Sequence, residues 1–119
     1  MKDFRTLTVW EKSHALTLIA YKVTQGFPTD ERFGLTSQIR RSSASIATNI
    51  AEGCGRQGNA EFKRFLQLAM GSATELDYQF LLSRDLGYLT SPSHTEIEMR
   101  VLEVKRMLST LIRKVHTER

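Results

Sequence analysis

The apolar residues in the last third of the chain recur at alternating steps of four and three, and this spacing restricts the fold more than any other feature. Such a stripe covers one face of an α-helix of about six turns and does not fit a strand. Its members are Ile97, Val101, Val104, Leu108, Leu111 and Val115. Ser91-Pro92 is a typical helix start, and Ser93 with Glu96 offers a capping box. We therefore expect a helix over residues 92–116.

Three earlier segments show the same helical spacing. The expected helices cover residues of about 8–25, 30–54 and 59–87. Thr29 and Asn59 are the expected N-caps of the second and third helices, and Gly87 is expected to end the third. The inward stripes are Val9, Leu16, Ile19, Ala20 and Val23 in the first; Leu35, Ile39, Ser43, Ile46, Ile50 and Cys54 in the second; and Phe62, Phe65, Ala69, Ala73, Leu76 and Phe80 in the third.

No segment alternates with a period of two, so the sequence predicts no strand. Four long helices joined by short turns predict an all-α protein, an antiparallel up-and-down four-helix bundle. The 119 residues fit one domain, residues 1–119. No apolar run approaches the roughly 18 residues of a membrane span. The first residues lack the apolar core of a signal peptide, and the single cysteine, Cys54, suits a reducing compartment. We therefore expect a cytoplasmic protein.

The second helix carries unusual residues outside its core stripe. The two additional rows are Ala44, Ala47 and Ala51, and Ser42, Asn49 and Arg56. Small residues let another helix approach closely, and polar rows often form hydrogen-bonded seams between helices. A monomeric bundle does not need so many contact faces, so the pattern favours a homo-oligomer. The alternative is that alanine and serine are merely tolerated on the surface.

Three patterns suggest chemistry, and none of them is convincing. Residues 53–58 spell G-x-G-x-x-G, but they follow a helix where a dinucleotide site follows a strand, which favours a glycine-rich turn. Glu11 and His14 form one E-x-x-H pair where a di-iron bundle needs two, and His94 is expected in a loop. Cys54 has no histidine near it in sequence to act as a base. We expect a non-enzymatic protein with no metal or cofactor.

The basic residues are better candidates for a function. The chain carries a formal charge of +4 and a pI near 9.5. Only Glu52 and Glu61 offset the basic residues between positions 38 and 66, which are Arg40, Arg41, Arg56, Lys63 and Arg64. Arg56 and the start of the third helix are expected to hold a phosphate through backbone N–H groups. An equally weighted interpretation pairs these cations with carboxylates of a neighbouring helix or subunit.

Several motifs resemble one known family across nearly the whole chain, from about Phe4 to Leu111. They are FGLTSQIRR at 33–41, NIAEG at 49–53, Gly55-Arg56, Val9-Trp10, Glu61-Phe62 with Phe65-Leu66, and RDLGYL at 84–89. The chain thereby resembles the four-helix bundle proteins encoded by intervening sequences of 23S ribosomal RNA genes. The resemblance implies a homopentamer with a central channel and no established enzymatic activity. That family is similar in fold to the accessory protein of diversity-generating retroelements, a basic pentamer that works with a reverse transcriptase and nucleic acid.

Two positions depart from the family's pattern. Ala47-Thr48 stands where the family often has Pro-Ser, and Cys54 stands where it often has a tyrosine. Without the proline, the second helix should be straighter.

Two hypotheses about function remain open at this point. In the first, a homo-oligomer binds RNA or another nucleic acid electrostatically, with the five basic residues named above contacting phosphates. In the second, the protein is an interaction scaffold with no role in nucleic-acid binding, and the cations are paired within subunit interfaces. Asn49 and Glu52 are either structural hydrogen-bonding groups or a functional pair, and their position near a helix end favours the structural role.

Overall fold

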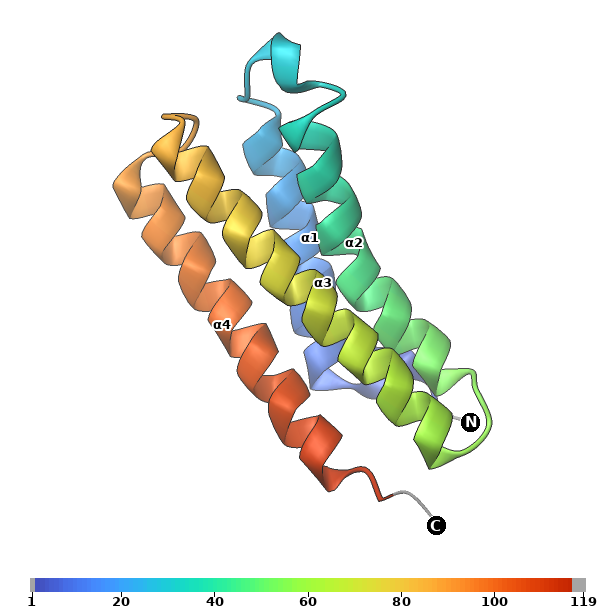
Figure 1. The fold of residues 1–119 in the computed structure, drawn as a ribbon. Helices are drawn as coiled ribbons and strands as arrows, with labels where there is room; N and C mark the ends of the chain where they lie inside the picture. The colour runs from blue at the N-terminus through green and yellow to red at the C-terminus, as the bar shows by residue number, and fades with distance from the viewer. Residues whose placement is uncertain (1, 117–119) are drawn as a thin grey trace.

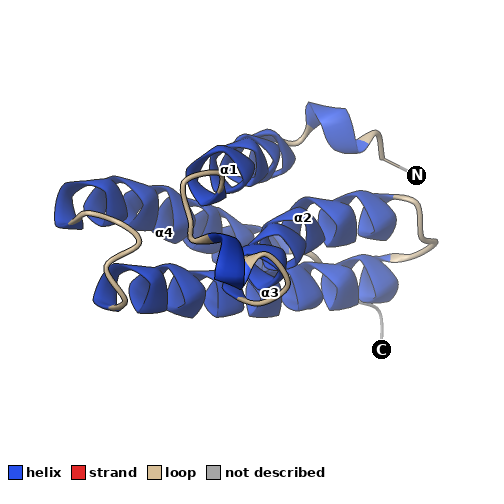
Figure 2. Cartoon of the chain, turned by 90° about the horizontal axis from the view of Figure 1, so that it is seen from above, coloured by secondary structure: helices blue, strands red, loops and turns tan. Residues whose placement is uncertain are grey.

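The computed structural model describes residues 2–116 and contains four long helices that run alternately up and down (Figure 1). They are α1 (Thr8–Thr24), α2 (Leu35–Cys54), α3 (Asn59–Asp85) and α4 (Ser91–Lys114), with short 3-10 helices η1 (Phe4–Thr6) and η2 (Thr29–Glu31). Figure 2 shows helices and loops and no strand in this part of the chain. The expectation of an all-α, four-helix architecture is therefore confirmed. Within residues 2–116, no helix has both the length and the apolar character of a membrane span.

Each helix packs against the next along the chain, and α1 also packs on α4. The core lies between the four helices, where the expected stripes are buried, for example at Leu16, Ile46, Leu76 and Leu108. Ile19, Val23, Leu111 and Val115 are only partly buried. These four belong to the segments of α1 and α4, which pack on each other less extensively than the other neighbouring helices do.

The start of α2 differs from the expectation. The helix begins at Leu35 and not near residue 30, because Thr29 belongs to the separate turn η2 and does not cap α2. The N-cap position belongs to Gly34, and the first amide of the helix, that of Leu35, instead donates to Oε1 of Glu31 at 3.1 Å. Oε2 of the same carboxylate accepts a second bond from the Tyr88 hydroxyl at 2.9 Å, and this bond raises the pKa of Tyr88. The Glu31 carboxylate therefore joins the start of α2 to the α3–α4 turn.

Two other expected caps were wrong, and one helix end was confirmed. Asn59 is the first residue of α3, while the N-cap position belongs to Gly58, whose φ of +83° is left-handed. The N-cap of α4 is Thr90, whose hydroxyl accepts from the Ser93 amide at 3.2 Å, so Ser93 does not start a capping box with Glu96. Gly87 ends α3 as expected, with φ +82° and its amide donating to the Arg84 carbonyl at 2.9 Å.

The position of His94 also differs from the expectation of a loop. It lies in the first turn of α4 and is buried, with 3% of its surface exposed. Its ring is therefore part of the interior of the bundle.

Residues 53–58 form the end of α2 and the turn into α3, as the sequence indicated. A Cβ on Gly53 would lie 2.8 Å from Cβ of Phe65 and 3.2 Å from Cδ1 of Phe62. Real Cβ atoms do not approach other carbons so closely. The glycine therefore lets α2 and α3 come together where the chain reverses.

We predict that Gly53→Ala destabilises the fold by about 1–3 kcal/mol, because the added methyl group overpacks the α2–α3 contact. Urea unfolding followed by circular dichroism measures the change. Gly55→Ala is the matched control, since a Cβ there meets only ordinary contacts and φ is −85°. Equal stability of the two variants would contradict this account of Gly53.

Candidate nucleic-acid interface

The antiparallel topology brings η1, the α2–α3 turn and the end of α4 to one end of the bundle (Figure 1). The Lys2 amide donates to the Cys54 carbonyl at 3.3 Å, which ties the N-terminal segment to the end of α2. We call this region the basic end. Its cations are Lys2, Arg5, Arg56, Lys63, Arg64, Arg113 and Lys114, and its carboxylates are Asp3, Glu52 and Glu61. Positive charge is therefore in excess here.

Three of these cations form exposed ion pairs with the three carboxylates. The pairs are Arg5–Asp3 at 3.3 Å, Arg56–Glu52 at 3.3 Å and Arg64–Glu61 at 3.0 Å. Exposed pairs of this kind typically contribute only about 0–1 kcal/mol, so a phosphate can compete for their guanidinium groups. The remaining four cations make no ion pair with any residue that the structure describes.

Two of the arginines share one aromatic support. The guanidinium carbons of Arg56 and Arg64 lie 5.0 Å and 4.5 Å from the ring centre of Phe65. This contact holds both guanidinium groups at the surface. Arg64 also donates a hydrogen bond to Glu61, which lowers the pKa of that carboxyl group. Both residues belong to the five basic residues that the sequence analysis selected, and the structure brings these two together over one ring.

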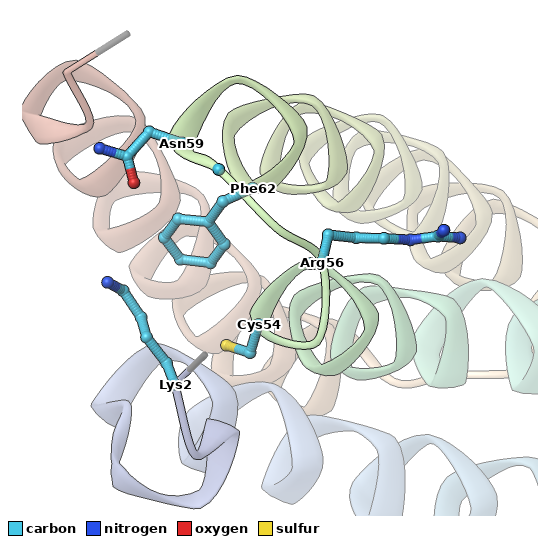
Figure 3. Close-up of a pocket in the computed structure, with 7 residues that line it drawn as sticks. Lys2, Cys54, Arg56, Asn59 and Phe62 are labelled. Carbon is cyan, nitrogen blue, oxygen red and sulfur yellow. The ribbon is translucent and has the colours of Figure 1, made fainter.

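A small hollow of about 80 Å³ opens beside the start of α3, lined by residues that include Gly53, Cys54 and Gly58. Figure 3 shows the Lys2 amino group pointing toward Asn59 and Phe62, while the Arg56 side chain points away from the hollow. No side chain in the described residues caps the N-terminus of α3, which leaves its N–H groups available to an anion. The cationic side chain that points toward the start of α3 is therefore that of Lys2 and not that of Arg56.

Arg40 and Arg41 lie away from the basic end, about 20 Å from the last residue of α2 at a rise of 1.5 Å per residue. Arg40 is packed on α1: its Nε donates to the Thr24 hydroxyl at 2.9 Å and its Nη2 to the Tyr21 carbonyl at 3.3 Å. Arg41 is exposed and makes no ion pair within residues 2–116. The structure therefore divides the five predicted residues into two groups.

The residues that the sequence analysis considered for catalysis, metal binding or a functional pair show no arrangement typical of those roles within the described residues. Burial raises the pKa of the Cys54 thiol, so the thiol stays protonated at neutral pH. His14 stacks on Trp10, with ring centres 5.1 Å apart and nearly parallel planes. Across the described residues, no three His, Cys, Asp or Glu side chains gather as metal ligands. Asn49 donates to the Ser45 carbonyl at 2.8 Å, which is a bond within α2.

The fold and the basic end together define a small helical-bundle protein with a positively charged end. Comparison with known families is more specific: residues 5–110 match the 23S rRNA-intervening sequence protein family, and the chain belongs to it. A crystal structure from Bacteroides thetaiotaomicron, described as a protein with unknown function from the S23 ribosomal protein family, is similar in fold. It is 26% identical, with a TM-score of 0.83 over 89% of this chain and 96% of that one. No curated protein sequence matches the chain.

We predict different effects of alanine at the two neighbouring arginines of α2. Arg40→Ala should cost about 1–2 kcal/mol, because it removes hydrogen bonds to the end of α1. Arg41→Ala should change the unfolding free energy of the subunit by less than about 0.5 kcal/mol, as exposed residues usually do. Urea unfolding of the isolated subunit, at a dilution where the mass is that of one chain, compares them. An Arg41→Ala loss as large as that of Arg40→Ala would refute the distinction.

We also predict that the Cys54 thiol reacts slowly in the folded protein. Its burial and raised pKa disfavour the thiolate, which is the reactive form. Ellman's reagent at pH 7 should label it much more slowly than in urea, and raising the pH toward 9 should accelerate labelling. A reaction as fast as that of free cysteine would show that the site activates the thiol.

Proposed function

We propose that this protein is a non-enzymatic, cytoplasmic homo-oligomer whose basic end binds RNA or another nucleic acid through its phosphates. The observation that carries the proposal is the excess of cations at one end of the bundle, four of which lack an ion pair within the described residues. Family resemblance adds the expectation of a pentamer. In such an assembly the charge of several basic ends is pooled.

The expected binding mode is electrostatic, with little reading of base identity. The Phe65 ring, which lies under Arg56 and Arg64, is buried and therefore offers no surface on which a base can stack. The side chains of Lys63, Arg113 and Lys114 can contact the phosphates of a nucleic-acid backbone, and such contacts do not depend on the base sequence. The uncapped start of α3 adds its backbone N–H groups to the same surface, and the Lys2 side chain adds a positive charge beside them.

The second candidate function is a protein-interaction scaffold that never touches nucleic acid. It is favoured by the local pairing of Arg56 with Glu52 and of Arg64 with Glu61, and by the use of Arg40 within the fold. In that case the charge of the basic end would serve solubility. The protein would then not bind RNA at any salt concentration, and neither would variants that lack cations of the basic end.

We predict that the protein binds generic single-stranded RNA with an affinity that falls steeply as salt rises, because bound phosphates release counterions. In fluorescence anisotropy, Lys63→Ala/Arg64→Ala should weaken binding several-fold. It should also reduce the slope of log affinity against log salt by about 0.7 for each phosphate that the variant no longer neutralises.

The control is Arg32→Ala/Arg84→Ala, which removes the same charge from the opposite end of the bundle. Its affinity should stay close to that of the unmodified protein. Binding that is independent of salt, or an equal loss in both double variants, would reject the basic end as the binding surface.

A further inference from the structure

A groove lies on the surface of the bundle between the start of α1 and the last turns of α4, and we call it the α1–α4 groove. Its volume is about 480 Å³. Its floor includes Leu7, Met107 and Leu111, and its rim on α4 consists of Arg106, Thr110 and Lys114. The three floor side chains pack against the core and are only partly buried. One subunit therefore leaves part of its apolar surface uncovered here.

The groove exists because α4 extends past the start of α1. The Lys12 ammonium and the Glu103 carboxylate form an ion pair of 3.6 Å, which places these two residues at one level of the bundle. From this level α1 extends only four more residues, about 6 Å, to Thr8, whereas α4 extends eleven, about 16 Å, to Lys114. Among the described residues, η1 lies against α1 and α2 and not against α4. The last turns of α4 therefore lack a neighbour on this side.

Both charged residues that line the groove are cations. Arg106 and Lys114 form no ion pair within residues 2–116, and no carboxylate of the described residues lines the groove. Glu103, three residues before Arg106 on α4, is already paired with Lys12. An apolar floor beside two unpaired cations is complementary to a binding partner that is both amphipathic and acidic.

The groove continues along α4 into a second hollow of about 540 Å³, and Arg106 lines both. Met99 and Leu102 also line the second hollow, and they are exposed over 65% and 42% of their surface. With Arg106, Thr110 and Lys114 they follow one another along α4 at helical steps of three and four. The exposed strip is therefore about 22 Å long, which corresponds to about four turns of helix.

The spacing of the cations favours a helix over other anionic occupants. Arg106 and Lys114 are eight residues apart, about 12 Å along α4, so the single carboxylate of a fatty acid reaches only one of them. Two carboxylates seven or eight residues apart on a helix that lies along α4 reach both. A nucleic-acid strand would use the cations but leave the apolar floor in contact with water. The methionines of the two hollows, Met99 and Met107, have flexible side chains that adapt to the surface of a partner.

We propose that the α1–α4 groove docks an amphipathic, acidic helix of another protein. Apolar side chains of that helix lie on Leu7, Met107 and Leu111, and its flanking carboxylates pair with Arg106 and Lys114. The inference does not rest on nucleic-acid binding, because Arg106 does not belong to the basic end and the apolar floor has no role there.

Fluorescence anisotropy on the full-length protein tests this docking with a labelled, designed peptide of about 18 residues, which spans the exposed strip as a helix. The peptide carries leucine at every third or fourth position and glutamate along both flanks. A peptide with lysine in place of each glutamate and a scrambled peptide of the same composition are the controls. The acidic helix should bind at least tenfold more tightly than either control.

Charge reversal in the groove tests the ion pairs. Arg106→Glu/Lys114→Glu should weaken binding of the acidic helix at least tenfold and should bind the lysine peptide instead. Lys22→Glu/Arg32→Glu is the matched control, since it reverses two exposed charges at the opposite end of the bundle, and it should change the affinity by less than about twofold in physiological salt. Arg106→Glu alone should weaken peptide binding several-fold and leave RNA binding nearly unchanged, which separates the groove from the basic end.

Met107→Gln tests the apolar floor, because glutamine has nearly the same length as methionine and a polar end. This variant should weaken binding of the acidic helix several-fold, whereas Met107→Leu should retain it. Circular dichroism should show an unchanged helix content in both variants, and sedimentation equilibrium an unchanged mass.

The acidic helix must bind, and its binding must depend on the groove, for the docking site to stand. No binding, equal binding of the acidic and lysine peptides, or an equal loss in the two double variants overturns it. A changed mass of Met107→Gln assigns the groove to a contact between copies, and laurate that binds with the same dependence on Arg106 and Lys114 assigns it to a fatty acid; either result overturns the proposed partner. Loss of the acidic helix in Arg106→Glu/Lys114→Glu, with gain of the lysine peptide, supports it.

Discussion

The close packing of α2 on α3 is the contact on which the rest of the structure depends. Gly53 allows the two helices to meet where the chain reverses, because the Phe62 and Phe65 side chains lie too close to where a Cβ would be. Farther along, Ser45 and Ser72 share a hydrogen bond of 2.8 Å, which fixes one helix against the other. Since Arg56 and Arg64 project from the two sides of this turn, their shared position over Phe65 follows from the same packing.

Periodicity predicted the helices because it reports burial, and burial here is set by whole stripes of residues. Helix ends depend instead on single hydrogen bonds among chemically similar candidates. Thr90 and Ser93 are equally suitable caps in sequence, and only the backbone geometry selects Thr90. Glu31 accepts the hydrogen bond of the first α2 amide from outside the helix and is held by Tyr88, a residue distant in sequence, so no local pattern could have indicated it.

The candidate site was predictable where its residues are close in sequence and was missed where the fold assembles it. Arg56, Lys63 and Arg64 flank one turn, so their proximity could be inferred. Lys2, Arg113 and Lys114 join them because an up-and-down bundle returns the end of α4 to the level of the N-terminal segment. That topology was already expected, and combining it with the charges near both chain ends would have identified them.

The arginines of α2 and of the turn that follows it differ in role because they already have different hydrogen-bond and ion-pair partners. Arg40 donates to the end of α1 and contributes to the fold, whereas Arg56 stays exposed at the basic end. Arg41 has neither environment, because it is exposed along the middle of the bundle and forms no ion pair within residues 2–116. In the proposed function, assembly and nucleic-acid binding would be linked, because basic ends gathered in one homo-oligomer would repel one another and a polyanion that neutralises them would stabilise the assembly. Such a coupling is reciprocal, so under the proposed function the assembled form would also be the form that binds nucleic acid more tightly.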